Sequence, residues 1–135
     1  MAAQQDILTT FRPAFEAAVA AFTTGDLDRT VAALPPDLEY HSLRQDPESA
    51  VHRGPDAVKH WVKRLSDFFE EWQVDALDFE QPAPNAVLAS YDLRGISRSA
   101  RVPVEVQVFE LWEFEGMRPV RARQFDNREA ALAAL

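Results

Sequence analysis

The stretch Pro103-Val-Glu-Val-Gln-Val-Phe-Glu-Leu-Trp-Glu-Phe114 is the longest β-strand signal in the chain. Successive side chains of a strand point to opposite faces, so its residues divide into two sets. The first set is apolar with one exception, and it consists of Val104, Val106, Val108, Glu110, Trp112 and Phe114. The second consists of Pro103, Glu105, Gln107, Phe109, Leu111 and Glu113. A carboxylate on an otherwise apolar face is the sharpest chemical clue in this sequence.

The hydrophobic pattern on either side of this strand predicts an α+β fold. Apolar residues recur at helical spacing over residues 7–22, 27–34 and 54–72, and alternate over 38–42, 74–79, 87–93 and 120–125. Residues 43–53 are predicted to form a loop, and 128–135 a final helical turn. We expect one domain over 1–135, in which a curved, mostly antiparallel sheet packs against three N-terminal helices. Such a cone leaves a pocket for a small molecule at its open end.

Composition excludes several classes of partner and site. The formal net charge of −8 argues against nucleic acid or an anionic membrane surface as a partner. The chain has no cysteine, which excludes disulfides and thiolate chemistry. The first residues lack the basic start and apolar run of a signal peptide, and no run is long enough for a membrane helix. We therefore expect a cytoplasmic protein.

Desolvation on an apolar face would disfavour the charged form of Glu110 unless a cation compensates, and a carboxyl in that state can serve as a general acid or base near neutral pH. The hairpin supplies a possible cation. A two-residue turn at Glu115-Gly116 would place Arg121 opposite Glu110, and a four-residue turn would place Arg123 there. A three-residue turn with a bulge would break this pairing. A structural ion pair explains the arginines as well as a role in a pocket does.

Tyrosines and other aromatic residues are the candidates for the pocket wall. Tyr91 is a candidate to position a substrate, and Tyr40 and Ser42 share one face of the strand over 38–42. The further wall candidates are Trp61, Trp112, Phe114 and Phe125. Core packing, with each tyrosine hydroxyl bonded to the backbone, is the alternative interpretation of these residues.

Several short motifs resemble the SnoaL-like domains of the NTF2-like superfamily. They are Phe22-Thr-Thr-Gly-Asp-Leu-Asp28, Pro36-Asp-Leu-Glu-Tyr-His-Ser42, Arg53-Gly-Pro-Asp-Ala-Val58, Leu111-Trp-Glu-Phe-Glu-Gly116 and Gln124-Phe-Asp126. The resemblance implies the cone fold shared by polyketide cyclases, ketosteroid isomerases, dehydratases, epoxide hydrolases and binding modules. It also implies that the tyrosine, the basic aspartate and the protonated aspartate of ketosteroid isomerase correspond to Ala18, Ser42 and Glu110. Fold alone does not choose among these functions.

Three functional hypotheses remain open on the sequence. The first is an acid–base enzyme without cofactor that acts on a small apolar carbonyl compound through Glu110. The second is a non-catalytic carrier or sensor with the same pocket. The third is an interaction module that forms a homodimer through the outer sheet face, where Leu88, Phe109 and Leu111 lie. The three histidines show no metal-binding spacing, so no metal site is expected.

Overall fold

The chain forms four helices and six strands in a computed structural model that describes residues 6–43 and 50–135. The N-terminal half contains α1 (Ile7–Thr23), α2 (Leu27–Val31), β1 (Glu39–His41), β2 (Val51–Arg53) and α3 (Gly54–Phe68). The remainder contains β3 (Phe69–Ala83), β4 (Ala86–Ser97), β5 (Pro103–Glu115), β6 (Arg118–Phe125) and α4 (Arg128–Ala133). The sheet runs in the order β2-β1-β6-β5-β4-β3, and only the β1–β6 pair is parallel.

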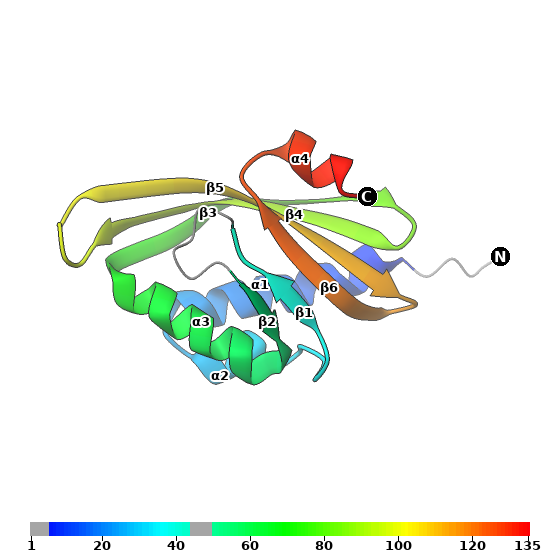
Figure 1. Ribbon diagram of the computed structural model, residues 1–135, viewed down its shortest axis with the longest axis horizontal. Helices are drawn as coiled ribbons and strands as arrows, with labels where there is room; N and C mark the ends of the chain where they lie inside the picture. Colours follow the sequence, from blue (N-terminus) through cyan, green and yellow to red (C-terminus); the bar gives the residue numbers. More distant parts are fainter. Residues whose placement is uncertain (1–5, 44–49) are drawn as a thin grey trace.

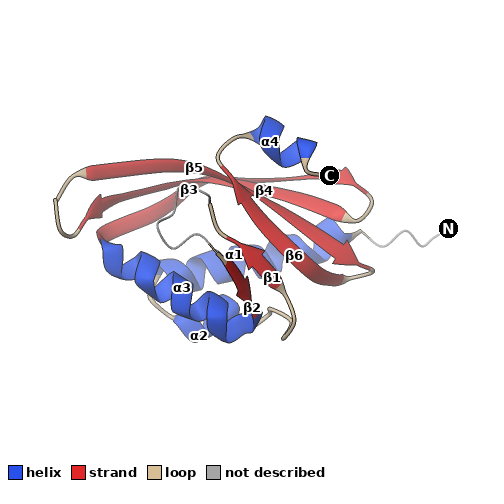
Figure 2. Ribbon diagram, viewed as in Figure 1, coloured by secondary structure: helices blue, strands red, loops and turns tan. Residues whose placement is uncertain are grey.

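The helices divide between the two faces of this curved sheet (Figure 1). The first three, α1 to α3, cover one face, and the short α4 lies across the other (Figure 2). The main core lies under α1 to α3 and includes Phe11, Trp61 and Trp112. The predicted α+β fold, with a mostly antiparallel sheet and three helices on one face, is therefore confirmed.

Residues of α4 pack against the apolar residues of the outer sheet face. Leu88 and Leu111 are fully buried in a second cluster with Ala131, and Phe109 packs against this cluster. The apolar side chains that suggested a dimer interface are therefore covered largely by the chain itself. Homodimer formation through this face stays a prediction.

Element boundaries differ from the prediction where long-range pairing overrides the local pattern. The helix predicted over 54–72 ends at Phe68, because Phe69 already pairs with Ser97 in the β3–β4 ladder. The strand predicted over 87–93 continues through Gly95 to Ser97 in β4, where a turn or flexible link beginning at Gly95 was also expected. A Cβ atom there would be 2.6 Å from the Glu71 carbonyl oxygen and from the Phe69 ring, so the ladder requires glycine.

In the N-terminal half the helix predicted over 7–22 is confirmed, whereas the loop predicted over 43–53 is wrong at its end, and residues 44–49 of that loop lie outside the described residues. The first helix begins at Ile7 and runs through Pro13, because Asp6 caps it by accepting from the N–H groups of Leu8 and Thr9 at 3.1 and 3.3 Å. The predicted loop over 43–53 contains β2, which pairs with β1 at Tyr40 and His52. This strand is only three residues long and lies in a polar stretch without a clear period, so the hydrophobic pattern did not predict it.

Gly54 makes the sharp turn from β2 into α3, and its replacement by alanine should destabilise the fold. Its φ is +81°, its N–H donates to the Leu38 carbonyl at 2.9 Å, and an added Cβ would lie 2.7 Å from the Pro36 carbonyl oxygen. We expect Gly54→Ala to lower the free energy of unfolding by about 2 kcal/mol or more, measured by urea denaturation. Gly25→Ala is the control, because Gly25 also has positive φ but nothing within 4 Å of its added Cβ. Equal losses in both variants would contradict the clash with Pro36.

Candidate functional site

A cavity of about 910 Å³ lies between the helices α1 to α3 and the inner face of the sheet. Its walls are mostly apolar. The whole first face of the strand over 103–114 lines it, namely Val104, Val106, Val108, Glu110, Trp112 and Phe114. Tyr40, Trp61 and Tyr91 also line it, as does Ala18 of α1. The alternation of side chains along β5 therefore holds over its full length.

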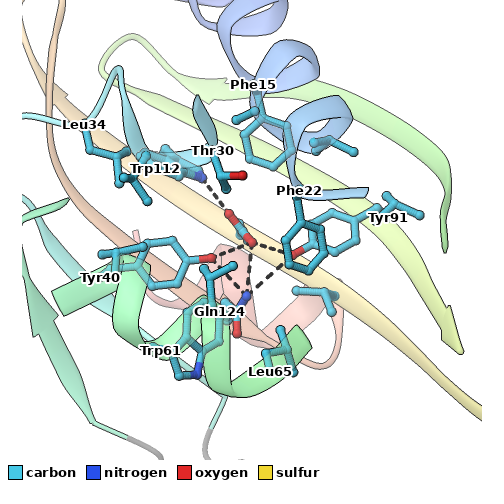
Figure 3. Close-up of a pocket in the computed structure, with 18 of the residues that line it drawn as sticks. Phe15, Phe22, Thr30, Leu34, Tyr40, Trp61, Leu65, Tyr91, Trp112 and Gln124 are labelled. Carbon is cyan, nitrogen blue, oxygen red and sulfur yellow. Dashed lines mark hydrogen bonds between the residues drawn. The ribbon is translucent and has the colours of Figure 1, made fainter. Parts of the chain in front are cut away.

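Four side chains converge on the buried carboxylate of Glu110, which is 3% exposed (Figure 3). Oε2 accepts hydrogen bonds from the Tyr40 hydroxyl at 2.7 Å, the Tyr91 hydroxyl at 2.5 Å and Gln124 Nε2 at 3.1 Å. Oε1 accepts one from the Trp112 indole Nε1 at 3.0 Å. These four donors belong to neutral groups, so the carboxylate is held by hydrogen bonds without a cation among them.

The donors are distributed unevenly over the two oxygens of Glu110. A carboxylate oxygen has two lone pairs, so three donors crowd Oε2 while Oε1 keeps capacity for a further donor. The amide orientation of Gln124 follows from the backbone N–H of Leu43, which donates to Gln124 Oε1 at 3.2 Å. A backbone N–H only donates, so the amide nitrogen of Gln124 must face Glu110.

The prediction that Glu110 shares its face with Arg121 or Arg123 was wrong. Glu110 pairs with Gln124 across the β5–β6 ladder, whereas Arg121 pairs with Glu113 and Arg123 with Leu111. The ladder ends at Glu115 and Arg118, and it shifts register by one residue between the partners of Phe114 and Glu113. This bulge reverses the parity of β6 relative to the predicted turns and sends both arginines to the outer face.

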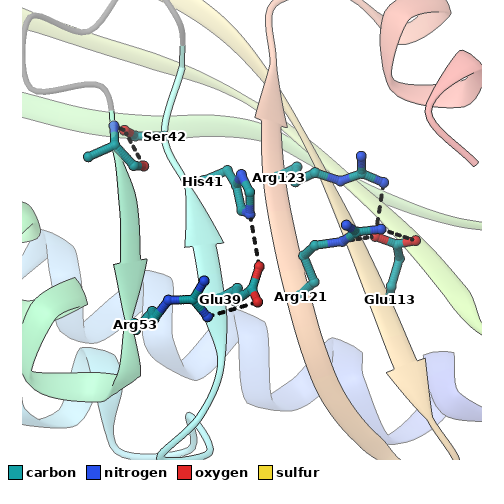
Figure 4. A network of polar contacts seen from close by, with 8 residues as sticks. Glu39, His41, Ser42, Arg53, Glu113, Arg121 and Arg123 are labelled. Carbon is teal, nitrogen blue, oxygen red and sulfur yellow. Dashed lines mark hydrogen bonds and ion pairs between the residues drawn. The ribbon is translucent and has the colours of Figure 1, made fainter.

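On the outer face the two arginines bind Glu113 (Figure 4). Arg121 donates to Glu113 through Nε at 2.7 Å and Nη2 at 3.1 Å, and Arg123 Nη2 donates to the same carboxylate at 2.9 Å. Burial alone would raise the pKa of Glu113, but the Arg121 hydrogen bonds and the charge of Arg123 lower it below its ordinary value. Arg121 and Arg123 therefore form a structural ion pair with Glu113, which was the alternative to a role in the pocket.

Ser42 and Phe125 do not line the cavity, which corrects two further predictions. β1 ends at His41, so its alternation does not extend to Ser42, whose hydroxyl instead accepts from the Ala50 N–H at 3.3 Å. Phe125 pairs with Phe109 and packs against the cluster under α4, because the bulge in β6 turns odd-numbered residues outward.

Gln124 contacts Glu110 but was not among the predicted site residues. Its inward position depends on the register of β6, which side-chain alternation within one strand does not determine. Pro119 carries the missing signal: proline has no N–H for the ladder and is confined in sheets to edges, strand starts and bulges. The register shift occurs directly beside Pro119.

Tyr40 and Tyr91, the two tyrosines of the chain, both donate to the same oxygen of Glu110. Burial raises the pKa of each hydroxyl well above 10, and the negative charge of Glu110 raises it further. Both hydroxyls therefore keep their protons at neutral pH and act as hydrogen-bond donors.

A family model for the SnoaL-like domain matches residues 15–122. The chain belongs to the SnoaL-like family. A search of curated proteins finds no match to it. Solved structures similar to this SnoaL-like chain include an NTF2-like protein from Anabaena variabilis, with 17% identity, 95% of each chain covered and a TM-score of 0.75.

Two further solved structures carry functional descriptions of their own. A candidate isomerase from Bacillus subtilis is 15% identical over 91% of this chain and 90% of its own, with a TM-score of 0.77. A candidate polyketide cyclase from Xanthomonas campestris is 16% identical over 97% and 98%, with a TM-score of 0.71. At these identities the likeness shows the fold alone.

Among residues 6–43 and 50–135, no three histidine or acidic side chains gather where a metal ion could bind. Within the same ranges, no helix has the length and apolar character needed to cross a membrane. Glu110 and its four donors inside the cavity form the candidate site of this SnoaL-like chain.

Proposed function

We propose that this protein is an acid–base enzyme without cofactor, in which Glu110 moves a proton on a small apolar carbonyl compound. One observation carries the proposal: the buried carboxylate faces an apolar cavity, has only neutral donors, and keeps hydrogen-bonding capacity at Oε1. A carboxylate held in this way at a substrate-sized cavity is suited to general base catalysis.

In the proposed reaction, Oε1 of Glu110 removes a proton from the carbon next to the carbonyl group, which leaves an enolate. Glu110 then returns a proton to the same carbon or, in a β,γ-unsaturated carbonyl compound, to the γ carbon of the dienolate, so atoms and electrons balance without an oxidant. Exchange of the carboxyl proton with D₂O before its return introduces deuterium into the product. Once Oε1 is protonated, Oε2 becomes a neutral carbonyl oxygen and no longer holds three donors. We assign Tyr91, which is only partly buried, as the donor that turns to the enolate oxygen.

Isomerisation and cyclisation of carbonyl compounds both begin with loss of such a proton. The candidate isomerase and the candidate polyketide cyclase among the solved structures are consistent with this chemistry, and they support it only by shared fold.

Deuterium exchange tests the proposal without knowledge of the natural substrate. We expect the protein to catalyse exchange of the protons next to the carbonyl of apolar ketones in D₂O, followed by proton NMR. Glu113→Gln is the matched control, because Glu113 lies on the same strand but binds arginines on the outer face. The control should exchange deuterium at the rate of the unchanged protein.

A non-catalytic carrier is the second candidate, and the donor geometry favours it in one respect. The hydroxyls of Tyr40 and Tyr91 and the indole N–H of Trp112 all donate to Glu110, so these three donors hold the carboxylate in place. If the protein binds ketones but does not accelerate their deuterium exchange above the rate in buffer, the carrier is the correct function. Trp61 and Trp112 line the cavity and report binding through their fluorescence.

A further inference from the structure

The cavity extends beyond Glu110 along the β4–β5 hairpin. On β5 the lining residues beyond Glu110 are Val108, Val106 and Val104, and on β4 the register places Tyr91 opposite Val108 and Leu93 opposite Val106. Val104 lies six positions before Glu110 in the sequence, which corresponds to about 20 Å along a strand. One end of the cavity is therefore an apolar arm, which we define by Val104, Val106, Leu93, Val74 and Phe22.

Helix α3 adds Leu65 and Phe68 to this side of the cavity. Figure 3 shows Phe22, Leu65 and Tyr91 grouped on one side of the central carboxylate, with Trp112 and Leu34 on the other. Besides Glu110, Arg64 is the only charged side chain on the described lining, and it is exposed on α3.

On the opposite side of Glu110, packed rings form part of the lining. The ring of Phe11 lies 5.2 Å from that of Trp112 and 5.7 Å from that of Phe114, centroid to centroid. Val104, Val106 and Val74 in the arm are only partly buried, although they face the cavity. The lining toward the tip of the hairpin is therefore more exposed than the lining formed by these rings.

We propose that the ligand is an amphiphile whose carbonyl head lies at Glu110 and whose unbranched apolar tail lies in the arm. The position of the head rests on the proposed function, whereas the tail rests on the shape and chemistry of the lining. An apolar lining that runs about 20 Å along the strand from a single polar point matches an extended chain better than a compact ring system. A tail would also cover the partly exposed valines of β5.

A chain-length series tests the tail directly. We expect the affinity for unbranched methyl ketones of six, eight, ten and twelve carbons, measured by tryptophan fluorescence, to rise about fourfold per methylene. Adamantanone has the same ten carbons as the linear ten-carbon ketone but a compact shape. It is expected to bind more weakly than the linear ketone, and equal or tighter binding of adamantanone would overturn the tail proposal.

Variants of β5 locate the tail. Val106→Phe should weaken binding of the ten-carbon ketone about tenfold or more, because the ring occupies the arm. Val104→Phe lies two residues closer to the hairpin tip, so it should affect the twelve-carbon ketone more than the eight-carbon one. It also serves as the second variant if Val106→Phe fails to fold by circular dichroism. Gln107→Phe places the same ring on the opposite face of β5 and is the matched control.

The outcomes separate the tail from the proposed reaction. A flat chain-length series with intact deuterium exchange would reject the tail and keep the enzyme. A rising series without exchange would keep the tail and reject the enzyme. A flat series in a protein that sediments as a dimer would assign the arm to a second copy of the chain, and would overturn the proposal.

Discussion

Replacing Glu110 by glutamine is expected to lower the rate of ketone deuterium exchange by about 10²–10⁴-fold. The amide has nearly the shape of the carboxylate but does not accept a proton from carbon under these conditions. Glu113→Gln makes the same chemical change on the opposite face of β5, where the carboxylate binds Arg121 and Arg123. It should leave the exchange rate unchanged. The two variants each remove one carboxylate, so a difference between them shows that the position of Glu110 in the cavity matters.

The glutamine variant has a second consequence, because its amide nitrogen would face a donor. Either Trp112 Nε1 or the donors at Oε2 would lose an acceptor, at a cost of about 1–3 kcal/mol in the free energy of unfolding. Exchange rates must therefore be compared at ketone concentrations that saturate both proteins, with folding verified by circular dichroism. A folded, ketone-binding Glu110→Gln protein that exchanges at the original rate would eliminate Glu110 as the base.

The sequence was sufficient to predict the strand that carries the site, but not its neighbour across the hairpin. Alternation along 103–114 depends only on local backbone geometry, so Val104 to Phe114 lie where the pattern predicts. The facing residue depends on the turn and on one bulge. Because of a single extra residue beside Pro119, Gln124 faces Glu110, and Arg121 and Arg123 lie on the outer face. The groups around Glu110 therefore differ from those that were predicted.

The tyrosines illustrate the same limit. Tyr40 and Tyr91 were predicted to line the pocket, and both do. Both hydroxyls donate to one oxygen of Glu110, although Tyr40 and Tyr91 lie 70 and 19 residues away from Glu110 in the sequence. This convergence depends on how the strands pair. Local propensity contains no information on such convergence. Similarly, no pattern in β4 or β5 indicates that α4 covers Leu88 and Leu111.

The two tyrosines also give the site an alkaline signature that is independent of any substrate. Tyr40 and Tyr91 are the only tyrosines of the chain, so the ultraviolet absorbance of phenolate reports on this site alone. Burial and the charge of Glu110 raise the pKa of both hydroxyls well above 10. We expect the folded protein to show no phenolate absorbance as the pH passes 10, whereas the protein unfolded in urea should titrate near 10.

This difference in pKa makes stability depend on pH in a defined direction. Above about pH 10 the unfolded chain releases two tyrosine protons that the folded chain still holds, so the unfolded state binds fewer protons. The stabilising contribution is complete below pH 10, and the free energy of unfolding falls as the pH rises toward the folded pKa values. Tyr91→Phe should reduce this fall, because only Tyr40 then differs between the two states. Titration of both hydroxyls near pH 10 in the folded protein would show that they are open to water, and would contradict their convergence on Glu110.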